Sequence, residues 1–118
     1  MASILVIDDQ QIVRDSYKDA LEESGHTVIT AADGAEALSF CENTRFDVVI
    51  TDVCMPRKEG VSVVRAVKSQ YEKTRIIVIS GAEKRSHYLE TAKAFGADLT
   101  LEKPVNLEKL RCYVDEMK

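Results

Sequence analysis

Short apolar runs alternate with amphipathic segments along the chain. Five runs predict β-strands, at residues 4–7, 28–29, 48–50, 76–79 and 99–101. The first, third and fourth runs are continuously apolar and rich in β-branched residues, which is typical of strands buried on both faces of a parallel sheet. The second and fifth runs are more polar, and the second fits the edge of a sheet better than its centre.

Amphipathic segments with helical spacing follow the apolar runs and predict five helices. Three of them span about residues 11–24, 61–70 and 84–95. The first is expected to end at Gly25, because glycine suits the position after a helix C-terminus. Another begins at Asp33, whose spacing to Glu36 is that of a capping box. The last begins at Asn106, a good N-cap residue, and continues to the end of the chain.

The five strand–helix units in 118 residues predict an α/β fold with a doubly wound, flavodoxin-like (βα)5 arrangement. Five parallel strands are expected in the order 2-1-3-4-5, with helices on both faces of the sheet. A chain of this length forms one domain, residues 1–118, and buries enough surface to fold without disulfides. In such sheets the functional site lies at the carboxyl ends of the strands.

The composition argues against several classes of function. Sixteen Lys and Arg residues against twenty Asp and Glu residues leave a net charge of −4, which argues against nucleic-acid binding. The longest apolar runs have four residues, so no membrane span is expected, and neither is a secretory signal. Three widely spaced cysteines without a C-x-x-C motif favour a reducing cytoplasm over a disulfide framework or a zinc site.

Chemically complementary side chains stand at the ends of four predicted strands. These are Asp8 and Asp9, Asp52, Ser80 and Lys103. Two carboxylates about 4 Å apart repel by roughly 4 kcal/mol at an effective dielectric of 20, so a converging set of carboxylates needs a cation. Oxygen ligands favour Mg²⁺, or Mn²⁺ in its place, over zinc. A carboxylate, a metal, a lysine and a hydroxyl at one point suit phosphoryl transfer, with one carboxylate as the nucleophile.

The two histidines are not at strand ends. His26 follows Gly25 before the second strand, and His87 lies in the predicted helix 84–95. Both are predicted to be surface residues rather than metal ligands.

The chain resembles the receiver domain of two-component response regulators over essentially its whole length. The matching motifs are Ile7-Asp8-Asp9, Asp52-Val53-Cys54-Met55-Pro56 with Gly60, Ser80-Gly81-Ala82, Gly96-Ala97 and Lys103-Pro104. The resemblance implies that Asp52 accepts a phosphoryl group from a sensor histidine kinase or a histidine phosphotransfer protein. The resemblance therefore implies that the protein is a signalling switch that promotes its own phosphorylation and dephosphorylation, rather than an enzyme acting on other substrates.

The resemblance also implies the roles of the other site residues. Asp9, Asp52 and the backbone carbonyl of Cys54 would bind Mg²⁺ directly, and Asp8 would bind it through a water molecule. Lys103 would pair with the phosphoryl group, Ser80 would move to bind it, and the Lys103–Pro104 bond would be cis. Two further points favour Asp52 as the nucleophile, because it ends the central strand and Gly81 leaves the approach open.

Three residues depart from the family's pattern or affect its kinetics. Thr100 stands where the family usually has an aromatic residue that swings inward with the switch hydroxyl. Either the coupled movement of this position and the switch hydroxyl is altered here, or Thr100 is simply a β-favouring surface residue. Val105 stands where phenylalanine is common, on a face that many receivers use for partners. Cys54 occupies a position that, in the family, helps to set how fast water attacks the acyl phosphate.

Three alternative functions make different demands on these residues. A flavodoxin needs a phosphate-binding loop after the first strand, where Asp8 and Asp9 would repel an anion. A haloacid-dehalogenase-type phosphatase needs a second Asp at the position of Cys54. A pseudo-receiver that binds partners without being phosphorylated is the remaining alternative. The expected protein is cytoplasmic, a monomer or weak dimer, with an unknown downstream protein target, and is either a stand-alone receiver or a piece of a longer protein.

Overall fold

The computed structural model describes residues 1–52, 59–80 and 96–117. Within them the strands are β1 (Ser3–Ile7), β2 (Thr27–Ala31), β3 (Val48–Asp52), β4 (Arg75–Ser80) and β5 (Leu99–Glu102). The helices are α1 (Gln11–Glu23), α2 (Gly34–Cys41), α3 (Glu59–Gln70) and α5 (Leu107–Met117). The predicted helix 84–95 lies outside the described residues. No helix in the described part of the chain has the length and apolar character needed to cross a bilayer.

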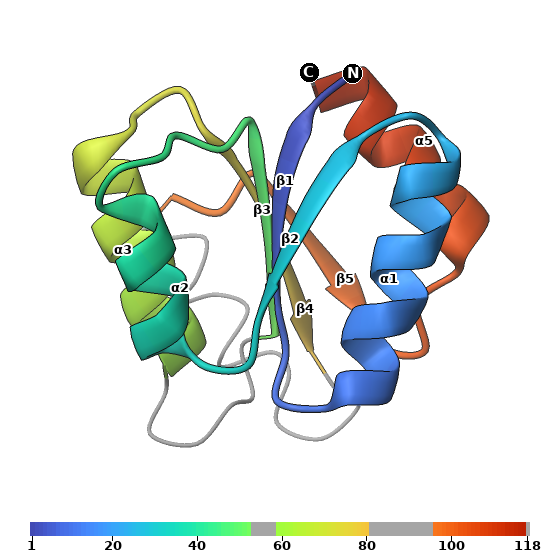
Figure 1. The fold of residues 1–118 in the computed structure, drawn as a ribbon, viewed down its shortest axis with the longest axis horizontal. Helices are drawn as coiled ribbons and strands as arrows, with labels where there is room; N and C mark the ends of the chain where they lie inside the picture. The colour runs from blue at the N-terminus through green and yellow to red at the C-terminus, as the bar shows by residue number, and fades with distance from the viewer. Residues whose placement is uncertain (53–58, 81–95, 118) are drawn as a thin grey trace.

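The strands form one parallel sheet in the order β2-β1-β3-β4-β5. Helices α2 and α3 cover one face and α1 and α5 cover the other (Figure 1). The predicted fold class is confirmed, and β2 lies at an edge as its polar pattern indicated. All five residues of β3 are buried, as expected for a central strand.

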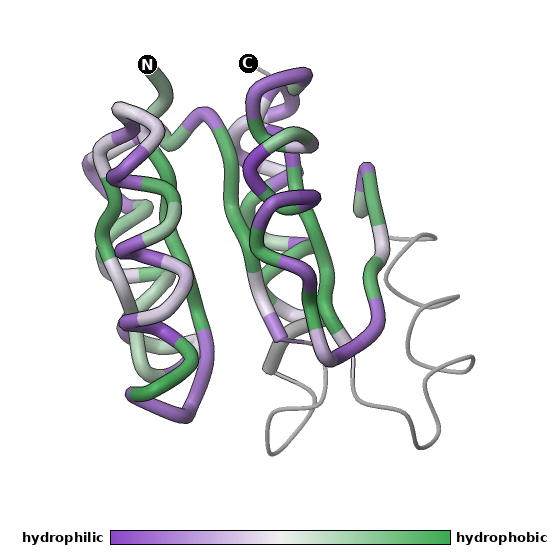
Figure 2. The backbone as a smooth tube through the Cα atoms, turned by 90° about the vertical axis from the view of Figure 1, so that its right-hand side faces the viewer, coloured by the Kyte–Doolittle hydropathy of each residue, from purple (hydrophilic) through white to green (hydrophobic). Residues whose placement is uncertain are grey.

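Side-chain alternation along the strands builds a separate apolar core on each face of the sheet. In β1, Leu5 and Ile7 pack beneath α2 and α3, whereas Ile4 and Val6 pack beneath α1 and α5. In Figure 2 the tube of the strands runs hydrophobic over long stretches, while the helices alternate between hydrophobic and hydrophilic residues. Each helix therefore covers the sheet with one stripe and presents the other to solvent.

Local signals end and begin the helices as predicted. Gly25 follows α1 with a φ of 92°, and its N–H donates to the Glu22 carbonyl at 2.9 Å. Asp33 caps α2 by accepting the Glu36 N–H at 2.8 Å. The Glu36 carboxylate accepts the Ala32 N–H at 2.9 Å, whereas in a capping box it would accept the N–H of the next residue, Asp33.

The prediction for His26 is wrong, because this side chain is buried, with 4% of its surface exposed. Its Nδ1 accepts the Ala2 N–H at 2.9 Å, and its Nε2 lies 2.9 Å from Asp115 Oδ1. With Nδ1 as acceptor, the ring donates from Nε2 to Asp115 and ties the start of β1 to α5. His87 lies outside the described residues.

Candidate functional site

The carboxyl ends of the parallel strands bring the predicted polar residues to one edge of the sheet. Asp8 follows β1 directly, and Asp52 is the last residue of the neighbouring β3. One carboxylate oxygen from each of Asp8, Asp9 and Asp52 lies within 4.8 Å of the others. Asp8 and Asp52 are buried, whereas Asp9 is exposed. The three carboxylates therefore form a compact acidic cluster that is open on one side.

Lys103 joins this cluster from the segment after β5. Its ammonium Nζ lies 2.8 Å from Asp52 Oδ2 and 3.3 Å from Asp8 Oδ2. Burial lowers the pKa of Lys103, but the hydrogen bond and charge of Asp52, together with those of Asp8, raise it overall to about 12. The ammonium is therefore positively charged at neutral pH, and one positive charge faces three carboxylates.

Hydrogen bonds fix both the side chain and the backbone of Asp8. Its Oδ1 accepts the Gln10 N–H at 2.9 Å, and its backbone carbonyl accepts a bond from Arg14 Nη1 at 2.8 Å. Burial raises the pKa of Asp8 and the charge of Asp52 adds to this, against the lowering by the Gln10 N–H and Lys103. The carboxylate is thus kept in an environment where its negative charge is costly.

The donor set fits a hard divalent cation. The three carboxylates outnumber the Lys103 ammonium and the nearby Arg14 guanidinium, and all the side-chain ligand atoms in the cluster are oxygens. Mg²⁺ and Mn²⁺ bind such oxygen sets and keep several waters. The carbonyl of Cys54, predicted as a further ligand, lies outside the described residues.

Ser80 ends β4 next to this cluster, fully buried. Its backbone carbonyl accepts the Lys103 N–H at 2.8 Å, which links the ends of β4 and β5. The Lys103–Pro104 peptide bond is cis, as the resemblance implies. Thr100 is half-buried in β5 opposite Val78, and both interpretations of this residue stay predictions.

Two residues of α1 near the cluster were missed from the sequence. Arg14 reaches back to the Asp8 carbonyl, and the only sequence signal is a cation one helical turn after an acidic pair. Tyr17 is a buried residue of the same helix, and its position beside the acidic cluster was not predicted. Burial raises the pKa of Tyr17 to about 12, and the charges of Lys103 and Asp8 also act on it.

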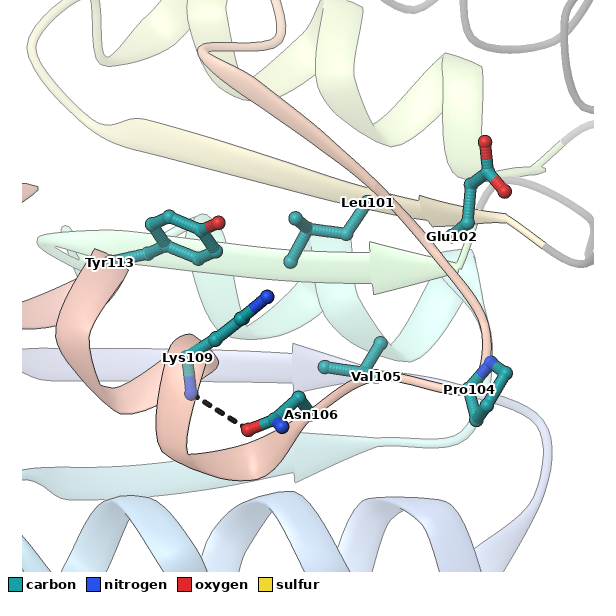
Figure 3. Close-up of a pocket in the computed structure, with 7 residues that line it drawn as sticks. All are labelled: Leu101, Glu102, Pro104, Val105, Asn106, Lys109 and Tyr113. Atoms are coloured by element: carbon teal, nitrogen blue, oxygen red, sulfur yellow. Dashed lines mark hydrogen bonds between the residues drawn. The ribbon is translucent and has the colours of Figure 1, made fainter.

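Two grooves flank the segment after β5. One, of about 470 Å³, lies between α1 and this segment; it is lined by Ile12, Val13, Ser16, Tyr17, Lys103, Pro104, Val105 and Leu107. The other, of about 240 Å³, lies between β5 and α5 and is drawn in Figure 3. In that view Leu101, Val105, Lys109 and Tyr113 surround the hollow, and the Lys109 N–H donates to Asn106 Oδ1 at 3.1 Å. This bond confirms Asn106 as the cap of α5, and Val105 borders both grooves.

Comparisons with known proteins agree on one family. The model of the response regulator receiver domain matches residues 4–115. Response regulator MprA of Mycobacterium sp. (strain KMS) is 40% identical over 107 residues, which cover 91% of this chain and 46% of the relative. The chain thus spans about half the length of the curated relatives it matches.

Solved structures agree over the full length of the chain. Chemotaxis response regulator CheY4 of Vibrio cholerae is 38% identical with a TM-score of 0.88, covering 100% of this chain and 99% of that one. A CheY-like receiver domain protein from Methanospirillum hungatei JF-1 is 28% identical with a TM-score of 0.91, covering 98% and 92% of the two chains.

Proposed function

The chain belongs to the response regulator receiver domain family of two-component signalling, and on that premise we propose that it is a switch operated by phosphorylation of Asp52. The observation that carries the proposal is Lys103 Nζ, which lies between Asp52 and Asp8 in a cluster completed by Asp9. Nothing in the described part of the site favours the alternative of a pseudo-receiver that is never phosphorylated.

In the proposed reaction, a carboxylate oxygen of Asp52 attacks the phosphorus of a phosphohistidine. The new O–P bond forms as the N–P bond breaks, and the histidine nitrogen of the donor keeps the electron pair. Lys103 leaves Asp8 to pair with a phosphoryl oxygen, and the Ser80 hydroxyl donates to another. Asp9, Asp52 and the Cys54 carbonyl would hold Mg²⁺, with Asp8 acting through water, and the ion would neutralise charge at the phosphoryl oxygens.

The phosphoryl group acts as a switch because it changes the charge next to Lys103. It replaces the single negative charge of the Asp52 carboxylate with up to two on the phosphoryl group at the end of β3, where Lys103 and Ser80 both respond to it. Since Lys103 continues directly into the segment that borders both grooves, its displacement alters the surfaces that a partner contacts. The domain promotes its own phosphoryl transfer and dephosphorylation and is not an enzyme acting on other substrates.

The proposed partners are a sensor histidine kinase or a histidine phosphotransfer protein as donor, and a downstream protein as target. Ile12, at the start of α1, is 82% exposed and lines the groove that also contains Lys103. An exposed apolar side chain in the groove that Lys103 lines suits a protein donor that docks there and extends its histidine to Asp52. We place the protein, a receiver domain over residues 1–118, in the cytoplasm as a monomer or weak dimer.

Intact-mass measurement after incubation with a small phosphodonor and Mg²⁺ tests the proposal. The wild type is expected to gain one phosphoryl group and Asp52→Asn none. Asp19→Asn, at an exposed position of α1, is the matched control and should be labelled like the wild type. Equal labelling of Asp52→Asn would show that the wrong residue has been assigned, and no labelling of the wild type by a small donor or a kinase would favour the pseudo-receiver.

A further inference from the structure

We propose that Arg14 is a positioning residue that fixes the Asp8–Asp9 turn in the geometry that binds the cation. This inference rests on the proposed function, because it concerns the metal ligands of the same site. Arg14 is the fourth residue of α1 (Gln11–Glu23), and its guanidinium points back toward the end of β1, where Nη1 donates to the Asp8 carbonyl at 2.8 Å.

Arg14 bonds to the backbone on both sides of the turn. Its own N–H donates to the Gln10 carbonyl at 3.1 Å and closes the first turn of α1. Its side chain holds the Asp8 carbonyl, which belongs to the peptide group between Asp8 and Asp9. The orientation of that peptide group decides where the two neighbouring carboxylates point relative to Asp52.

The other groups of Asp8 are already fixed by the fold. Its N–H donates to the Ala31 carbonyl of β2 at 3.2 Å, and its Oδ1 accepts the Gln10 N–H at 2.9 Å. The bond from Arg14 therefore secures the remaining backbone group at the junction of Asp8 and Asp9. Without it the exposed Asp9 gains freedom, because its carboxylate lies at the open side of the cluster.

The charge of Arg14 and its hydrogen bond have opposite effects on cation binding. A positive charge near the cluster repels an incoming Mg²⁺, so its removal strengthens binding if charge is the main contribution. Loss of the bond to the Asp8 carbonyl weakens binding if position is the main contribution. The guanidinium bond ends on a neutral carbonyl and not on a carboxylate, so the geometry points to position.

The first experiment measures the Mg²⁺ dissociation constant by calorimetry for the wild type, Arg14→Met, Arg14→Lys and Arg45→Met. Arg45 has the same charge and a half-exposed side chain at the opposite end of the sheet, before β3. Arg14→Met is expected to bind Mg²⁺ roughly 10-fold more weakly. Arg14→Lys is weakened by a smaller factor, and Arg45→Met matches the wild type. Equal or tighter binding by Arg14→Met overturns the inference.

The second experiment uses metal-free protein and follows exchange of the Gln10 amide hydrogen by NMR. This amide donates to Asp8 Oδ1, so it exchanges faster in Arg14→Met if the turn has loosened, and at the wild-type rate in Arg45→Met. Unchanged exchange in Arg14→Met overturns the inference even if the wild type binds Mg²⁺. A wild type that fails to bind Mg²⁺ contradicts the proposed metal site instead, and the exchange rates still decide whether Arg14 holds the turn.

Discussion

Replacing Lys103 with methionine removes the ammonium from between Asp8 and Asp52 and keeps most of the side chain's length. The distances of 2.8 and 3.3 Å from Nζ to the two carboxylates correspond to attractions of roughly 6 and 5 kcal/mol at an effective dielectric of about 20. Carboxylates no more than 4.8 Å apart repel by about 3.5 kcal/mol or more for each pair. The lysine thus roughly offsets the repulsion within the cluster.

The measurable loss is smaller than these opposing contributions, because water and proton uptake relieve an uncompensated carboxylate. Removing one partner of a buried ion pair typically costs roughly 3 to 5 kcal/mol, and the partly exposed Lys103 belongs at the lower end of that range. In metal-free protein, Lys103→Met is therefore expected to lose about 3 kcal/mol of unfolding free energy. Saturating Mg²⁺ should restore much of it, since the ion supplies positive charge at the same oxygens.

Urea unfolding followed by circular dichroism, in EDTA and in saturating MgCl₂, measures both effects. Lys109→Met, an exposed position on α5, makes the same change of net charge away from the cluster and should leave stability unchanged. The reasoning is refuted if metal-free Lys103→Met lies within about 0.5 kcal/mol of the wild type, the usual range for surface substitutions. It is also refuted if Mg²⁺ stabilises both proteins equally.

Three further substitutions test other parts of the structure. Asp8→Asn should raise the metal-free unfolding midpoint at neutral pH. Folding raises the pKa of Asp8 above 3.8, so the wild type loses stability as the pH rises from the unfolded to the folded pKa. The stability advantage of Asp8→Asn over the wild type therefore grows across that pH range. An advantage that shrinks there would contradict the assignment. Ile12→Ser should slow phosphoryl transfer from a phosphohistidine protein roughly 10-fold and leave the rate of transfer from a small phosphodonor unchanged. Phe40→Ser, on α2, is the control. Equal slowing of transfer from both donors would exclude a docking role for Ile12. His26→Ala should cost about 2 kcal/mol in urea unfolding, because the Ala2 N–H loses its buried acceptor; Asp115→Asn, which keeps an acceptor oxygen, should cost less, and a wild-type midpoint for His26→Ala would argue against the bridge.

Much of the fold could be predicted because hydrophobic periodicity is a local property. The apolar runs located all five strands, but their ends were less certain. Strand β2 extends over Thr27–Ala31 rather than 28–29, because Thr27 and Thr30 pair with β1 through the backbone and need no apolar side chain. Strand β3 extends beyond its apolar run and ends at Asp52 as expected, where a polar residue still forms part of the ladder.

The gathering of Asp8, Asp9 and Asp52 at one edge follows from parallel topology alone, so it could be predicted once the strands were placed. Lys103 was expected at the same edge, because it follows the fifth strand, but its individual contacts and those of Arg14 could not be predicted in this way. Lys103 and Arg14 have several rotatable bonds, and their contacts depend on the three-dimensional positions of the groups they reach. The exposure of His26 was predicted wrongly because its two hydrogen-bond partners, Ala2 and Asp115, lie at opposite ends of the chain.

The parallel sheet also separates the chemistry from the chain ends. Strand β1 begins and α5 finishes at the edge of the sheet opposite to Asp8 and Asp52, with the two ends close together (Figure 1). A fluorescent protein or a surface linker fused at either end therefore sits away from the acidic cluster. Protein immobilised or labelled in this way keeps the cluster accessible, so binding of a phosphodonor can be followed on a sensor chip without blocking the surface being measured.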